Sequence, residues 1–248
     1  MFKDFLEGAK CFLRGFNLVM KPGLRRFVLV PLIINALLFT AAIWLGIAQF
    51  DTLMDWLLPE GSSWWAEFAR VVLWVFFAAG VLLILLFTFT VVANLIGAPF
   101  NGLLSEKVEG YLSGKEIQES GGIRDFISSI IPSILSELRK LVYFLILGGL
   151  LLILSLIPVV NVIAPFLWAV FASWMLALEY IAYPMENHRI SFSQVRTGLK
   201  RKKMLALGFG SAAMAITLIP VVNFLVMPAA VAGATVMWTE RLKGMNLG

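Results

Sequence analysis

The chain has 248 residues, of which 60% are hydrophobic and only 14% are charged, and its formal net charge is +5. Because an ordinary soluble domain is about 45 to 50% apolar and about 25% charged, this composition argues against a soluble enzyme or binding module. It indicates an all-α integral membrane protein. Apolar runs fill most of the chain and leave no polar stretch for a separate core, so we expect one membrane domain over residues 1–248.

Residues 1–22 are predicted to form an amphipathic helix, which Lys21-Pro22-Gly23 ends. Such a helix lies in the membrane interface, and the alternative is a soluble helix that packs on loops of the same protein. Because this region is charged throughout, we expect no cleaved signal peptide. The single cysteine, Cys11, permits no disulfide within one chain. The apolar residues at helical spacing are Phe2, Phe5, Leu6, Ala9, Phe12, Leu13 and Phe16.

Two long uncharged runs, in residues 24–50 and 71–100, are predicted to be transmembrane helices. The first holds 24 consecutive residues without a charge, or about 36 Å of helix against about 30 Å of hydrocarbon. The second, with 30 such residues, would be about 45 Å long and should project beyond the bilayer. Trp56, Trp64 and Trp65 lie between the two runs and are typical of an interface.

The segment 101–140 is mixed in polarity. Within it, residues 123–138 show apolar residues at helical spacing and predict a second amphipathic helix. Pro132 interrupts this pattern, so we expect either a kink or a second helix start there.

Two later apolar blocks, 141–178 and 204–238, share a phrase and are predicted to be repeated helical hairpins. The sequence Leu156–Asn161 returns unchanged as Leu218–Asn223. Because proline disfavours helix at the preceding residue, each hairpin should turn there. The first arms have 17 and 16 residues, or about 25 Å, which is marginal for crossing a bilayer. The blocks are therefore either short transmembrane pairs or hairpins that enter the membrane and return.

The distribution of charge predicts the topology. If the N-terminus is cytoplasmic and both hairpins return to their starting side, the segment 51–70 faces outward with Arg70 as its one basic residue. The other 19 of the 20 basic residues then lie inside, which is a strong positive-inside bias.

Motifs for enzyme chemistry are scarce. The only histidine, His188, has no ligand spacing around it and is predicted to lie in a loop. The sequence contains neither a Gly-x-Ser-x-Gly elbow nor a Walker phosphate loop. We therefore predict no enzyme activity, no ATP-driven pumping, no metal or other cofactor and no nucleic-acid partner. A catalytic carboxylate among the acids is the alternative.

The most suggestive polar site is the group Gly23, Leu24, Arg25 and Arg26, at the predicted start of the first long helix. Backbone N–H groups at a helix start lack partners, and the helix dipole favours an anion there. Gly23 permits close approach, and the two guanidinium groups suit an oxyanion such as sulfate or phosphate. The alternative is that these cations only anchor the helix at lipid headgroups.

Five further polar residues are candidates for lining a transport pathway. The alternative role of the asparagines is to contact other helices or to cap a turn. The alternative for the charged residues is ordinary solvation or ion pairing. The candidates are Asn35, Asn94, Asn101, Glu106 and Lys107.

Three stretches resemble the CysZ family of bacterial sulfate permeases, and the resemblance covers nearly the whole chain. They are Ala98–Glu106, Tyr183–His188 and the region from Leu207 to Trp238, which includes the second Ile-Pro-Val-Val-Asn.

The resemblance implies a homo-oligomeric permease of the bacterial inner membrane, surrounded by lipid, that takes up sulfate for cysteine biosynthesis. It implies that a Gly-Leu-Arg motif, here Gly23, Leu24 and Arg25 with Arg26 adjacent, binds sulfate. It also implies two long membrane helices and two partly penetrating hairpins. Sulfite and other oxyanions are alternative substrates. A non-transporting, anion-sensing scaffold is the alternative function, and a membrane enzyme acting on anionic lipid ranks last.

Overall fold

The computed structural model of the chain describes residues 1–57, 64–114 and 123–245, apart from some side chains within the helices. Every regular element in these ranges is helical, which confirms the predicted all-α class. The chain divides into two compact units, residues 1–29 with 98–248 and residues 30–97. The elements are α1 (Phe2–Val19), α2 (Arg26–Leu57), α3 (Trp64–Leu112), α4 (Ile123–Ser155), α5 (Pro158–Asn161), α6 (Ala164–Asn187), α7 (Phe192–Arg201), α8 (Lys203–Thr217), α9 (Pro220–Met237) and the π-helix η1 (Trp238–Leu242).

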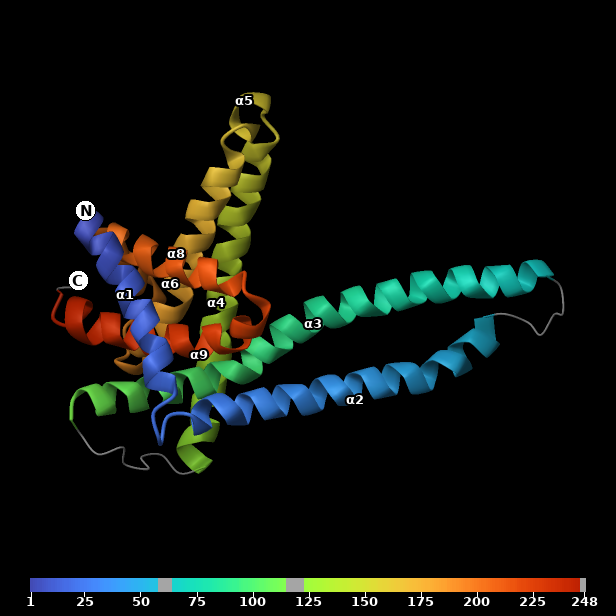
Figure 1. Cartoon of the computed structure of the whole chain (residues 1–248), viewed down its shortest axis with the longest axis horizontal. Coiled ribbons are helices and arrows are strands. Elements are labelled where there is room, and N and C mark those ends of the chain that lie inside the picture. The colour runs from blue at the N-terminus through green and yellow to red at the C-terminus, as the bar shows by residue number, and fades with distance from the viewer. Residues whose placement is uncertain (58–63, 115–122, 246–248) are drawn as a thin grey trace. The chain divides into compact units, whose positions relative to one another are not determined.

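In the first unit, α1 packs against α8 and α9 (Figure 1). The approach is close because glycines stand at the crossings. A side chain at Gly8 would overlap the backbone of α8, and one at Gly15 would overlap the backbone of α9. The predicted amphipathic helix therefore packs on the protein's own helices rather than on its loops. Its other face still exposes Phe2, Leu6 and Leu13, which leaves membrane contact of α1 a prediction.

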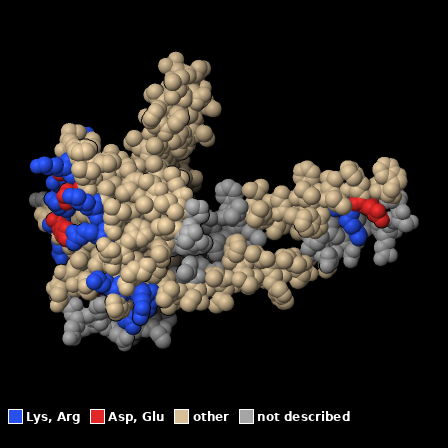
Figure 2. Space-filling model, in the orientation of Figure 1, with Lys and Arg blue, Asp and Glu red and all other residues tan. Residues whose placement is uncertain are grey.

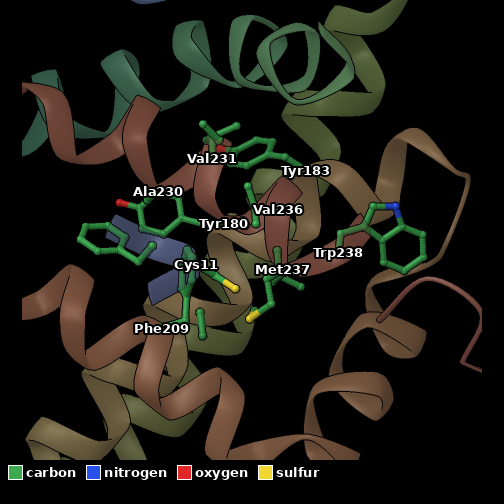
Figure 3. Packing of buried hydrophobic residues seen from close by; sticks show 14 of the residues in the cluster. Cys11, Tyr180, Tyr183, Phe209, Ala230, Val231, Val236, Met237 and Trp238 are labelled. Carbon is green, nitrogen blue, oxygen red and sulfur yellow. The ribbon is translucent and has the colours of Figure 1, made fainter. Parts of the chain in front are cut away.

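The core of this unit lies between α1, α6, α8 and α9. Figure 3 shows Cys11 and Phe209 close to Tyr180 and Met237 in this cluster. Phe12 and Phe209 pack edge to face, with ring centroids 5.6 Å apart, which is a favourable aromatic geometry. The N-terminal helix is thus part of the core.

Cys11 is expected to resist thiol reagents while the protein is folded. Its side chain is buried, and burial raises the pKa of the thiol to about 11. Because the thiolate is the reactive form, labelling at pH 8 should be at least about tenfold slower than in denaturant. Mass spectrometry of alkylated protein before and after denaturation measures this. Equal labelling rates in both states would contradict the packing of α1.

The first hairpin consists of α4 and α6, joined by the short helix α5 at the tip (Figure 1). Its turn begins at Pro158, as the sequence predicts. The predicted arm length of 17 residues is wrong, because α4 runs for 33 residues through Pro132, which opens no second helix start. Among the described residues, Ile134–Ser155 and Ala164–Asn187 are each long and apolar enough to cross a membrane.

The second hairpin keeps the short arms that the sequence predicts. Helix α8 has 15 residues, α9 has 18, and α9 begins at Pro220. Unlike the first hairpin, much of its surface is buried, because α8 packs on α6 and both α8 and α9 pack on α1. Two copies of one sequence phrase therefore turn at the same place and differ in how they are packed.

The second unit, residues 30–97, contains most of α2 and of α3. Both helices exceed the predicted limits, since α2 extends to Leu57 and α3 runs from Trp64 to Leu112 through Pro99. Many described side chains here are large, apolar and exposed, including those of Trp44, Ile47 and Phe76. Such a surface needs lipid or other protein around it.

Candidate functional site

The predicted oxyanion site forms the turn between α1 and α2. Helix α1 ends at Val19 and α2 begins at Arg26, so Gly23 to Arg25 precede the first helical residue as expected. Gly23 has a φ of 87°, a left-handed conformation that glycine adopts without steric cost. The glycine therefore determines the path of this turn.

Two backbone N–H groups that the sequence suggested were free to bind an anion already donate hydrogen bonds within the turn. The N–H groups of Leu24 and Arg25 both donate to the carbonyl of Lys21, at 3.1 and 3.3 Å. The expectation that these N–H groups lack partners is therefore wrong. The N–H of Gly23 makes no hydrogen bond to any residue that the structure describes. An anion at this turn would be bound by that one amide and by side chains.

Leu24 holds the turn in place, since its side chain is fully buried in the core of the first unit. Gly23, Arg25 and Arg26 are exposed around it. The Arg26 guanidinium lies over the Phe27 ring, 5.1 Å from its centroid, a cation–π distance. The turn thus combines a fixed backbone with two exposed guanidinium-bearing side chains next to a helix start.

The pathway candidates are divided between the two units. Asn101, Glu106 and Lys107 belong to the same unit as Gly23 to Arg26, whereas Asn35 and Asn94 are in the second unit and their side chains lie outside the described residues. Glu106 is exposed and Lys107 is buried. Asn101 is also buried, and its Nδ2 forms no well-aligned hydrogen bond in the described part of the chain, although its side chain interacts with the Tyr183 hydroxyl. A buried amide nitrogen without a well-aligned hydrogen bond is costly, and water or a passing anion would satisfy it.

Ion pairs join the charged ends of several helices in the first unit. Glu109 on α3 accepts from Lys243 at 2.7 Å and contacts Nε2 of His188 at 2.8 Å. Arg14 on α1 makes a bidentate pair with Glu240, and Arg241 pairs with Glu7. Figure 2 shows charges of both signs gathered on one side of the first unit, while the projecting part of the α4–α6 hairpin shows none on the visible face. The sequence singles out His188 but could not indicate its contact with Glu109, because 79 positions separate the two residues.

Glu109 is expected to make stability depend on pH in the acid range. Burial raises its pKa, but hydrogen bonds from Lys243 and His188 outweigh burial and hold it below the usual 4.5. A lowered pKa gives stability that is present above pH 4.5 and is lost as pH falls through the folded pKa. Glu109→Gln should therefore cost about 1 kcal/mol at pH 7, a modest value because Lys243 is half exposed. The difference in melting temperature from wild type should shrink at pH 4, and a constant difference would contradict this assignment.

A second polar cluster lies at the base of the α4–α6 hairpin and was missed by the sequence reasoning. Lys140 pairs with Glu137 at 2.6 Å, with exposed fractions of 6 and 13%. Tyr183 Oη donates to Glu137 at 2.7 Å, and Ser136 Oγ donates to Glu186 at 2.5 Å. The available signal was the Glu137–Lys140 spacing, which places the two side chains on one helix face.

Comparison with known proteins identifies the family. Residues 11–228 match the family described as sulfate transporter CysZ/Etoposide-induced protein 2.4. Proteins named sulfate transporter CysZ are 43% identical in Pseudomonas fluorescens (98% of this chain, 96% of the relative), 45% in Pseudomonas syringae pv. tomato (95 and 92%) and 37% in Pectobacterium atrosepticum (97 and 87%). The matched stretch includes the Gly23–Arg26 turn and the first hairpin. The chain belongs to the CysZ/EI24 family of sulfate transporters.

Proposed function

We propose that this chain is a sulfate permease of the bacterial inner membrane that passes sulfate without ATP hydrolysis and feeds cysteine biosynthesis. The family supports sulfate as substrate, because the relatives that match over nearly the full chain are named sulfate transporters. The exposed apolar side chains of the first hairpin and of the second unit support a location in lipid. The same surfaces support assembly with further copies of the chain.

The observation that carries the proposal is the Gly23–Arg26 turn. A buried leucine holds a left-handed glycine and two exposed arginines at a helix start. A guanidinium can offer two parallel N–H groups to two oxygens of one sulfate, which a lysine ammonium cannot do. The exposed N–H of Gly23 would add a third donor. We propose that sulfate binds there before it enters the membrane.

Asn35, Asn94, Asn101, Glu106 and Lys107 remain proposed pathway residues. Among them, Asn101 has the best support, because its buried Nδ2 forms no well-aligned hydrogen bond among the described residues. An amide of this kind can donate to a dehydrated anion.

The test is uptake of labelled sulfate into proteoliposomes, together with sulfate binding measured on the same preparations. Arg25→Ala should lower affinity at least about tenfold and reduce uptake at subsaturating sulfate, because it removes a charge-assisted bidentate contact. Arg25→Lys should restore only part of the loss. Lys200→Ala removes an exposed cation elsewhere in the first unit and should change neither measurement.

Two outcomes would contradict the proposal in different ways. Uptake unchanged in Arg25→Ala would retain transport and place the binding site elsewhere. Wild-type protein that binds sulfate but shows no flux above empty liposomes would instead favour the anion-sensing scaffold.

A further inference from the structure

A cavity of about 410 Å³ lies at the base of the α4–α6 hairpin, entirely within the first unit. Its wall combines residues from the C-terminal half of α3, from α4, from the end of α6, from the loop between α6 and α7 and from the first residue of α7. The charged and polar groups that matter for its chemistry are Ser136, Glu137, Arg139, Glu186, Asn187 and Arg189. None of these residues belongs to the Gly23–Arg26 turn.

The cavity wall carries two carboxylates and two guanidinium groups, and among the described residues no direct ion pair joins them. Glu137 is satisfied by Lys140 and Tyr183, whereas Glu186 has only the Ser136 hydroxyl as a described side-chain partner. Arg139 and Arg189 are exposed and form no ion pair with any carboxylate of the described residues. Lys140 and Arg139 act on Glu186 electrostatically, but no cation among the described residues hydrogen-bonds to its carboxylate, and a largely buried carboxylate is best stabilised by such direct contact. The wall therefore offers one acceptor for a cation and two donors for an anion.

This balance of charge selects the class of ligand. A sulfate dianion would meet Arg139 and Arg189 but would also be repelled by Glu137 and Glu186. A ligand that carries an ammonium next to an anionic group satisfies both halves of the wall. The ammonium can donate to Glu186 and the anionic group can accept from the arginines.

The position of the cavity indicates where such a ligand comes from. Leu135 and Leu138 are chain neighbours of the wall residues Ser136, Glu137 and Arg139, and their side chains are 47 and 44% exposed. The exposed apolar surface of the hairpin continues from Leu141 onward. Uncharged apolar surface faces acyl chains, and the first charged turn beyond it lies at headgroup depth. Amphiphilic ligands would thus place a polar head in the cavity and their chains on the leucines.

We propose that this cavity binds the headgroup of a phospholipid of the phosphatidylethanolamine class. Its primary ammonium donates to the Glu186 carboxylate, and its phosphate accepts from Arg139 and Arg189. Its acyl chains lie along Leu135 and Leu138. The lipid would fix the base of the first hairpin, and the site is separate from the proposed sulfate site.

The backbone at Arg189 allows a clean test. This residue has a φ of 60°, its N–H donates to the carbonyl of Glu186 at 2.8 Å, and the N–H of Ile190 donates to that of Met185 at 3.1 Å. Asparagine tolerates this left-handed conformation better than most residues. Arg189→Asn therefore removes the guanidinium and keeps the turn. Glu186→Gln removes the negative charge and keeps an acceptor for Ser136.

The experiment is native mass spectrometry of the full-length protein released from detergent that contains defined lipids. Wild type should bind one phosphatidylethanolamine about tenfold more tightly than phosphatidylcholine, because a trimethylated ammonium cannot donate a hydrogen bond. Arg189→Asn and Glu186→Gln should each weaken phosphatidylethanolamine binding about fivefold, and Glu186→Gln should also remove the preference over phosphatidylcholine. The control variants Lys200→Gln and Asp4→Asn make the same charge changes outside the cavity and should bind as wild type does.

Four results would overturn the proposal. One is equal binding of phosphatidylethanolamine and phosphatidylcholine by wild type, and another is a preference for phosphatidylglycerol, which would indicate a site for anionic lipid. The third is competition by free phosphoethanolamine as strong as by the intact lipid, which would assign the cavity to a water-soluble zwitterion. Variants that keep a wild-type melting temperature and wild-type lipid binding would also contradict it.

Discussion

Gly210→Ala is expected to prevent the first unit from folding stably. A methyl group at Gly210 on α8 would overlap the carbonyl group of Ser173 on α6. The added methyl group is fixed to the backbone of α8, and the atoms that it would overlap are backbone atoms of α6. A change of side-chain rotamer cannot relieve this clash, so the two helices must move apart. Separation would also break the 3.1 Å hydrogen bond from Ser211 Oγ to Ser173 Oγ. We expect a loss of at least about 3 kcal/mol, measured by thermal unfolding in detergent.

The matched control is Gly149→Ala on α4, in the same unit. A methyl group there meets no atom within 4 Å, and alanine favours helix over glycine by about 0.5 to 1 kcal/mol. The control should therefore melt at or slightly above the wild-type temperature. If both variants melt alike, the close crossing of α6 and α8 is not what stabilises this unit.

The hairpin turns could be predicted from the sequence, whereas the length of the first hairpin could not. Pro158 and Pro220 each follow a residue in an extended conformation and begin a new helix, which is a local consequence of the proline ring. Pro132 and Pro99 have the same chemistry but lie inside helices. Whether neighbours compensate for the missing hydrogen bond depends on tertiary contacts. The sequence pattern does not contain that information.

The candidate sulfate site could be predicted in position but not in its hydrogen bonding. A glycine and an arginine pair at a helix start follow from local sequence, and α2 does begin at Arg26. The left-handed conformation of Gly23 was found only in the structure. The exact path of the turn decides that the Lys21 carbonyl accepts hydrogen bonds from the N–H groups of Leu24 and Arg25. The burial of Leu24 depends on helices far along the chain. The polar cluster around Glu137 was missed for the same reason, since α4 and α6 bring its members together.

Lys140→Met is expected to destabilise the first unit by about 3 to 5 kcal/mol, because it leaves the Glu137 carboxylate buried without its cation. The ammonium is 2.6 Å from Glu137 and lies over the Tyr183 ring, 4.3 Å from its centroid. It also interacts electrostatically with Glu179 and Glu186. Thermal unfolding of the variant in detergent measures the loss.

The double variant Glu137→Gln with Lys140→Met separates charge from packing. Glutamine keeps an acceptor for the Tyr183 hydroxyl, and methionine keeps most of the lysine stem against the Tyr183 ring. If the cost of Lys140→Met is an unpaired buried charge at Glu137, the double variant should recover more than half of the lost stability, since replacing a whole buried pair is often nearly neutral. A double variant as unstable as the single one would show that Glu179 or Glu186 is the carboxylate that needs Lys140. The base of the hairpin would then depend on the charge balance of the cavity rather than on one ion pair.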